Sequence, residues 1–162
     1  MELDQAAKKK VLRDFTYGLY AVTAAHDDER GVFTANWLSQ ASFEPPLVML
    51  SVENDSSTLS LIRASGRFAI CPLDESQKAL AGALGRPKAR AGDKYATLEL
   101  TIVDTESGVP ALAESLGYIV CDVSSESPAG DSVVFIAEVV EARSFADAPP
   151  LEMRAAGFRH AG

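Results

Sequence analysis

Short runs in which apolar and β-branched residues alternate with polar ones recur along most of the chain. A period of two is typical of β-strands with one buried face, and turn residues between the runs mark hairpins. The run at residues 47–52, LVMLSV, is almost continuously apolar, which predicts a strand buried on both faces. We expect strands at residues 19–25, 32–38, 47–52, 67–73, 97–103, 117–123 and 132–142.

Some other segments carry apolar residues at helical spacing, and the remaining segments show no regular spacing. We expect an N-terminal helix within residues 1–15 and further helices at residues 59–65 and 75–84. Residues 109–116 form a linker in this interpretation, and residues 146–162 form a C-terminal arm. No repeat or boundary divides the chain, so a single domain of residues 1–162 is expected. The predicted fold is mainly β: a six- to seven-stranded antiparallel barrel, closed or split, with short flanking helices.

Composition narrows the classes of partner. A chain of 162 residues with 47% hydrophobic residues can bury a core of its own. Its formal charge of −8 argues against nucleic acid and anionic membranes, because phosphate binding needs clustered lysine and arginine. No apolar run is long enough to span a bilayer, and no signal core follows the charged N-terminus. We therefore expect a soluble cytoplasmic protein.

Cysteine and histidine are too sparse to predict a metal site. Cys71 and Cys121 lie far apart in apolar runs, without a C-x-x-C or a neighbouring histidine, which favours buried free thiols. His26 lies in the charged turn HDDER, where solvation is expected. His160 lies near the C-terminus, and both a frayed tail and a dimer contact stay open for it.

Residues 31–46 combine a strand pattern with crowded hydroxyl and amide side chains. These side chains belong to Thr34, Asn36, Ser39, Gln40 and Ser42. Such a segment can follow the rim of a planar heterocycle, while Phe33, Trp37 and Leu38 cover apolar surface. A strand with a polar exposed face that ends at Pro45-Pro46 explains the pattern equally well.

Two further segments carry groups suited to anions. Residues 54–58, NDSST, precede a predicted helix, where hydroxyl groups suit a phosphate; capping of that helix alone is the alternative. Residues 85–95 form a Gly/Pro-rich stretch with basic side chains at Arg86, Lys88, Arg90 and Lys94. This stretch suits an anion clamp and equally a solvated basic loop.

The sequence lacks the common nucleotide-binding motifs and the motifs of enzymes whose own side chains carry out the reaction. It has neither G-x-G-x-x-G nor G-x-x-x-x-G-K-[ST], so Rossmann and Walker-type nucleotide sites are unsupported. It has no G-x-S-x-G elbow, and two isolated histidines do not supply a hydrolytic triad. We therefore expect a bound cofactor to supply any reactive group, and we assign no catalytic residue.

The run TANWLSQASFEPPLVMLSVENDSSTLSLIRASGRFAI resembles the core signature of the flavin reductase-like family of FMN-binding split barrels. In that family a T-A-N-S-x-x-S-V-S-x-x-P-P run precedes an apolar strand, then S-x-T and a helix that ends at S-G-x-F. The likeness extends from about Leu12 to the C-terminus. It implies a split barrel, FMN or FAD as cofactor, NAD(P)H as co-substrate, and a homodimer whose second subunit closes the cleft.

The resemblance also implies which residues hold the cofactor. The strand segment suits the flavin ring, Ser56 and Thr58 match the hydroxyls that hold the flavin phosphate, and the basic stretch adds two cations. The implied set is Thr34, Ala35, Asn36, Trp37, Leu38, Ser39, Asn54, Ser56, Ser57, Thr58, Arg90 and Lys94.

Two positions depart from the family pattern. Lys88 stands where relatives carry a serine, and Gly130-Asp131-Ser132 stands where NADH-using relatives carry G-D-H. A serine does not reproduce the stacking surface or the titration of an imidazole. Hydride transfer itself needs only two rings held face to face.

Three functions follow from this interpretation. The first is an NAD(P)H-dependent flavin reductase, which we favour because it is the commonest activity of proteins with this signature. The second is a flavoredoxin-type electron-transfer protein that keeps FMN and exchanges electrons with a redox partner protein. The third is a flavin-binding or cofactor-free protein with a regulatory or storage role.

Overall fold

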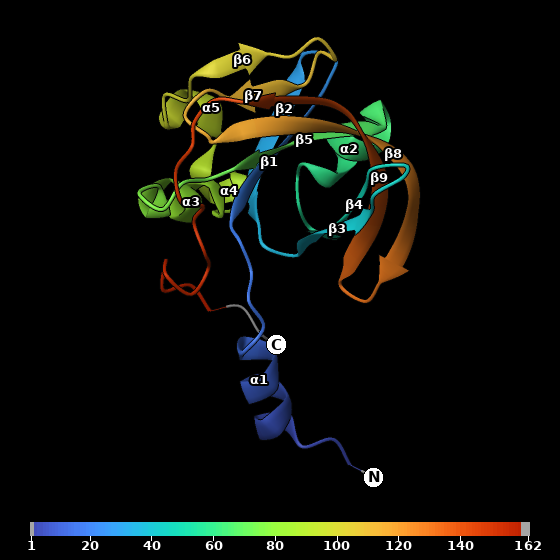
Figure 1. The fold of residues 1–162 in the computed structure, drawn as a ribbon, viewed down its shortest axis with the longest axis vertical. Helices are drawn as coiled ribbons and strands as arrows, with labels where there is room; N and C mark the ends of the chain where they lie inside the picture. The colour runs from blue at the N-terminus through green and yellow to red at the C-terminus, as the bar shows by residue number, and fades with distance from the viewer. Residues whose placement is uncertain (1, 160–162) are drawn as a thin grey trace.

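The structure, a computed structural model, describes residues 2–159, and one curled antiparallel sheet of seven strands forms its centre (Figure 1). The strand order is β2-β1-β5-β8-β9-β4-β3. β2 and β3 are consecutive along the chain but form opposite edges of the sheet, so the barrel stays split between them. The strands are β1 (Tyr20–His26), β2 (Glu29–Ala35), β3 (Leu38–Ser42), β4 (Leu47–Glu53), β5 (Arg67–Pro72), β8 (Gly117–Ala129) and β9 (Ser132–Ser144).

The predicted mainly β split barrel is confirmed, with differences in single elements. The strand predicted at residues 32–38 stops at Ala35, and Asn36 and Trp37 lead from β2 to β3. The Ser51 N–H donates to the Trp37 carbonyl over 3.0 Å, which ties this break to β4. The break is needed because the chain passes there from one edge of the sheet to the other.

The strand predicted at residues 97–103 is wrong over most of its length. The short helix α5 (Lys94–Thr97) occupies its start, and only β6 (Ile102–Asp104) is extended. Asp93 caps α5 through a hydrogen bond of 3.0 Å from the Tyr95 N–H, a local signal that outweighs the β-branched content. β6 pairs with β7 (Pro110–Leu112), which lies inside the predicted linker, in a separate two-stranded sheet.

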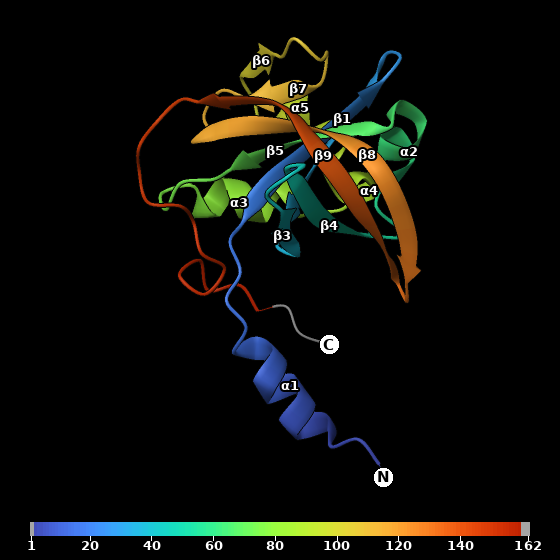
Figure 2. The same cartoon turned by 45° about the vertical axis from the view of Figure 1, so that its right-hand side comes forward.

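Residues 2–159 form four further helices, of which three lie against the body. α1 (Gln5–Arg13) buries no residue and projects away from the body, as both views show (Figure 2). α2 (Leu59–Ser65) follows β4 and ends at Gly66, whose φ of 68° is left-handed. α3 (Lys78–Leu84) and α4 (Lys88–Ala91) lie on the other side of β2 and lead into α5.

Packing separates the core into two clusters, one inside the barrel and one under α3 and the β6–β7 sheet. β4 shows how the inner cluster is formed, because Val48, Leu50 and Val52 are buried. Its alternate residues Leu47 and Met49 are half-exposed, so the strand is buried on one face and not on two as predicted. The opposite face of β4, with Leu47, Met49 and Ser51, is therefore only partly covered by residues 2–159.

The predicted arm after β9 returns along the body. The Leu151 N–H donates to the Leu73 carbonyl over 2.8 Å, and the Met153 N–H donates to the Tyr17 carbonyl over 2.9 Å. Leu151 and Met153 are buried, so this segment belongs to the packed structure. His160 lies outside the described residues.

Other expectations concern single residues. Cys71 and Cys121 are free and buried, as predicted. His26 is exposed and lies 3.6 Å from Asp27. Between residues 2 and 159, no helix combines the length and the apolar character that crossing a membrane would require.

Glu141 on β9 anchors the loop between β6 and β7. Its carboxylate accepts hydrogen bonds from the Glu106 and Ser107 N–H groups, the Ser107 hydroxyl and the Tyr118 hydroxyl. Burial raises the pKa of Glu141, but these hydrogen bonds act more strongly and lower it to about 2. The charged carboxylate therefore stabilises the folded state.

Replacing Glu141 with Gln should lower the free energy of unfolding at pH 7 by about 1 kcal/mol, because amide hydrogens would face backbone donors and solvent screens part of the interaction. The folded pKa lies below the unfolded value of 4.5. The contribution is thus complete above pH 4.5 and is lost as the pH falls toward 2. Urea unfolding should show a smaller difference between wild type and E141Q at about pH 3 than at pH 7. An equal difference at both pH values would contradict this assignment.

Candidate functional site

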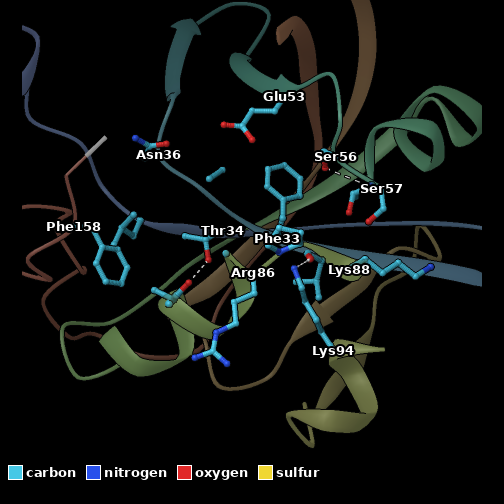
Figure 3. A pocket seen from close by; sticks show the side chains of 18 of the residues that line it. Phe33, Thr34, Asn36, Glu53, Ser56, Ser57, Arg86, Lys88, Lys94 and Phe158 are labelled. Atoms are coloured by element: carbon cyan, nitrogen blue, oxygen red, sulfur yellow. Dashed lines mark hydrogen bonds between the residues drawn. The ribbon is translucent and has the colours of Figure 1, made fainter. Parts of the chain in front are cut away.

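A cavity of about 950 Å³ opens at the split of the barrel (Figure 3). Its walls come from β2, the end of β4, the residues before α2, the segment from α3 to α4, and the C-terminal segment. This volume is at the upper end of the range for small-molecule sites, so the cavity has room for more than one ring system.

The cavity gathers most of the side chains that the sequence analysis singled out. The predicted residues on its wall are Thr34, Ala35, Asn36, Trp37, Ser56, Ser57, Thr58 and Lys94. Leu38, Ser39, Asn54 and Arg90 lie outside it. Ser39 is exposed on β3, and the Asn54 side chain donates to the Gly130 carbonyl over 3.2 Å. Arg90 is an exposed residue of α4.

Several of these wall residues use their side chains to hold the cavity together. The Thr34 hydroxyl donates to the Ala81 carbonyl and joins β2 to α3. The Asn36 amide donates to the Met153 sulfur over 3.3 Å and joins the strand to the C-terminal segment. Thr58 is 1% exposed, and a Cβ at Gly31 would lie 2.6 Å from its Oγ1, so Thr58 packs against β2. Any ligand contact near Thr34 therefore falls mainly to the backbone.

One end of the cavity is cationic. Lys94 is only 8% exposed, and its ammonium donates to the Val32 carbonyl over 3.1 Å and to the Leu84 carbonyl. Burial lowers the pKa of Lys94. Within residues 2–159, none of the ion pairs includes Lys94. Because a buried charge without a counter-ion is unfavourable, this end is suited to a bound anion.

Short polar side chains and a second lysine surround the same end. Ser56, Ser57 and Lys88 belong to the cavity wall, as Lys94 does, and Figure 3 shows the Lys88 side chain extending away from Lys94. The Ser56 hydroxyl accepts a hydrogen bond of 3.4 Å from the Thr58 N–H, which fixes the turn before α2. Hydroxyl and ammonium groups donate hydrogen bonds, and phosphate oxygens accept them.

The rest of the wall is apolar and aromatic. Phe33 lies between the two ends of the cavity, and Phe158 lies at the end opposite the serines (Figure 3). A Cβ at Gly82 would lie 3.4 Å from the Phe158 ring, so the ring packs closely on α3. Sequence reasoning missed Phe158 and Met153 because they reach the cavity only through the fold. Their one local signal was the apolar residues of the arm.

Ser132, which stands where the resemblance implies a histidine, does not belong to the cavity wall. It is 3% exposed, and its hydroxyl donates to Asp131 over 3.1 Å. Its partner in the ladder between β4 and β9 is Glu53, which does belong to the wall. The aromatic residues of the cavity wall are Phe33, Trp37 and Phe158.

Comparison with known proteins agrees with this geometry. The family model described as "Flavin reductase like domain" matches residues 12–162. The reductase component of a 4-nitrophenol 4-monooxygenase/4-nitrocatechol 2-monooxygenase from Rhodococcus opacus is 34% identical over 142 residues, which cover 88% of this chain and 74% of that protein.

Solved structures show the same arrangement of the fold. Nitrilotriacetate monooxygenase component B from Mycobacterium thermoresistibile has a TM-score of 0.81 and 28% identity, over 92% of this chain and 82% of the other. The Streptomyces globisporus C-1027 NADH:FAD oxidoreductase SgcE6, in complex with NAD and FAD fragments, has a TM-score of 0.81 and 25% identity, over 100% and 98% of the two chains. The split barrel, its cavity and these matches together show that the chain belongs to the flavin reductase-like family.

Proposed function

We propose that the protein is an NAD(P)H-dependent flavin reductase that binds its flavin, FMN or FAD, in the cavity with a phosphate beside Lys94. The observation that carries this proposal is the buried Lys94 ammonium, which has no carboxylate partner among the described residues and borders a cavity with aromatic walls. A flavin nucleotide combines an aromatic ring system with an anionic phosphate, so it matches both features.

Each part of the wall then has a role in binding. Lys94, Lys88 and the hydroxyls of Ser56 and Ser57 hold the phosphate. The backbone of residues 34–37 faces the polar edge of the ring, and Phe33 covers apolar surface. Leu38, Ser39, Asn54 and Arg90 are left out of this set because they lie outside the cavity wall.

The nicotinamide nucleotide supplies a hydride, which carries two electrons to the flavin ring. The chain holds the two rings face to face and excludes water. Phe158, at the end of the cavity away from the phosphate, offers the second ring an aromatic surface. The cavity volume of about 950 Å³ leaves room for this second ring.

A second copy of the chain is proposed to cover the outer face of β4 and β9. Met49 and Ile136 are paired neighbours on that face and are half-exposed, and Val140 is 47% exposed. Ser51 lies on the same face of β4 and also borders the cavity. A homodimer formed there would bury an apolar surface and close one side of the site.

The relatives suggest how the product is used. The Rhodococcus opacus relative and the Mycobacterium thermoresistibile structure are named as components of monooxygenases. By analogy, reduced flavin formed by this protein would serve a separate partner enzyme that uses it with oxygen. A cytoplasmic location is part of this proposal, since free buried cysteines are typical of proteins in a reducing compartment.

Anaerobic addition of NADH or NADPH to the protein with FMN or FAD should bleach the flavin absorption at a rate proportional to enzyme concentration. A flavin that stays bound but is bleached by neither nucleotide would contradict the reductase assignment and favour the electron-transfer protein. Failure to bind either flavin would contradict the cofactor assignment as well.

Replacing Lys94 with Met should weaken FMN binding by roughly 10- to 100-fold, because one charge-assisted hydrogen bond to phosphate is lost. Riboflavin has no phosphate, so its affinity should change less than twofold. Arg90→Gln removes a nearby charge outside the cavity and should leave both affinities within about twofold. Fluorescence titration of each ligand gives these values, and circular dichroism checks the fold.

Equal losses of FMN and riboflavin affinity in K94M would show that Lys94 supports the fold of the site and does not hold the phosphate. A larger loss of FMN affinity in R90Q than in K94M would indicate that the phosphate binds at α4.

A further inference from the structure

A small second cavity of about 20 Å³ adjoins the cationic end of the main cavity. Val32, Ser57, Lys88 and Lys94 border both cavities, so the two meet at the proposed phosphate position. Arg30 borders only the second cavity. The positive region therefore continues past the place where a single phosphate would end.

Arg30 is held in position by an aromatic ring. Its guanidinium carbon lies 4.2 Å from the centroid of the Tyr95 ring. Tyr95 is 4% exposed, and its hydroxyl donates to the Gly31 carbonyl over 2.9 Å, so the ring is fixed to β2. Burial raises the pKa of Tyr95, which keeps the phenol neutral and able to donate. The guanidinium thus has a defined place at the edge of the second cavity.

One carboxylate borders the second cavity and already accepts a hydrogen bond. Asp93 borders the second cavity and accepts the Tyr95 N–H over 3.0 Å as the cap of α5. Within residues 2–159, the ion pairs do not include Arg30. A stacked guanidinium is suited to bind phosphate oxygens through two parallel hydrogen bonds.

FMN and FAD differ at this end of the molecule. FMN ends at one phosphate, whereas FAD continues into a second phosphate and an adenosine. A second phosphate bonded to one held by Ser57, Lys88 and Lys94 would reach the second cavity. The adenosine beyond it would lie in solvent, since the second cavity is too small to enclose it.

We propose that Arg30, stacked on Tyr95, binds the second phosphate of a flavin dinucleotide, so that the protein prefers FAD to FMN. This inference rests on the proposed function and on the phosphate position at Lys94. It makes Arg30 a specificity-determining residue for the flavin, with no part in the hydride step.

The test is the affinity of the wild type and Arg30→Gln for FAD and for FMN, measured by fluorescence titration at one ionic strength. The wild type should bind FAD more tightly than FMN. The substitution should weaken FAD binding about tenfold and FMN binding less than twofold, because only FAD carries the second phosphate. Arg13→Gln removes an exposed arginine of α1 that borders neither cavity, and should change neither affinity.

The following results would overturn the inference or the proposed function on which it rests. Equal losses for FAD and FMN would place Arg30 at the shared phosphate, and unchanged affinities would leave it a solvated residue. An increased KM for NADPH alone, with KM for NADH and both flavin affinities unchanged, would assign it to the nicotinamide nucleotide. A wild-type protein that binds no flavin would overturn the proposed function itself, whereas a wild type that binds FMN at least as tightly as FAD would overturn only the dinucleotide preference.

Discussion

The rest of the site depends on one constraint: the Lys94 ammonium is buried and has no carboxylate partner within residues 2–159. The carbonyls of Val32 and Leu84 orient the Lys94 side chain and join β2 to the end of α3. These carbonyls provide only partial charges. Burying an ion in a protein is unfavourable by several kcal/mol unless an opposite charge compensates for it. In the proposed function a phosphate in the adjoining cavity would supply that charge, and ligand binding would be coupled to the local packing of the fold through the Lys94 ammonium.

The split of the barrel decides where this lysine can meet a ligand. β2 and β3 form opposite edges of the sheet although only Asn36 and Trp37 separate them along the chain. The cavity occupies the opening, with backbone of β2 on one side and α3 on the other. A closed barrel would fill this space with side chains, as the inner core cluster does around Leu50 and Phe135.

The sequence predicted those parts of the fold and site that depend on local pattern. Alternating residues located most strands, and the polar segment with Thr34 and the serines at 56 and 57 was found because neighbouring residues carry the signal. Lys94 and Arg90 looked alike in a basic stretch, and only tertiary packing buries one and exposes the other. Phe158 comes from the C-terminal segment, so no local pattern could have placed it at the site. Arg30 lies on β2 itself, but its stacking on Tyr95 joins two segments far apart in the sequence and has no local signal either.

The most direct test of the central claim is a crystal structure of the protein with FMN bound. The account predicts a phosphate oxygen within about 2.7–3.2 Å of the Lys94 Nζ, with the Ser56 or Ser57 hydroxyl as a further donor. It also predicts that the isoalloxazine ring lies along residues 34–37. A phosphate bound elsewhere, with Lys94 still contacting only the Val32 and Leu84 carbonyls, would contradict the account.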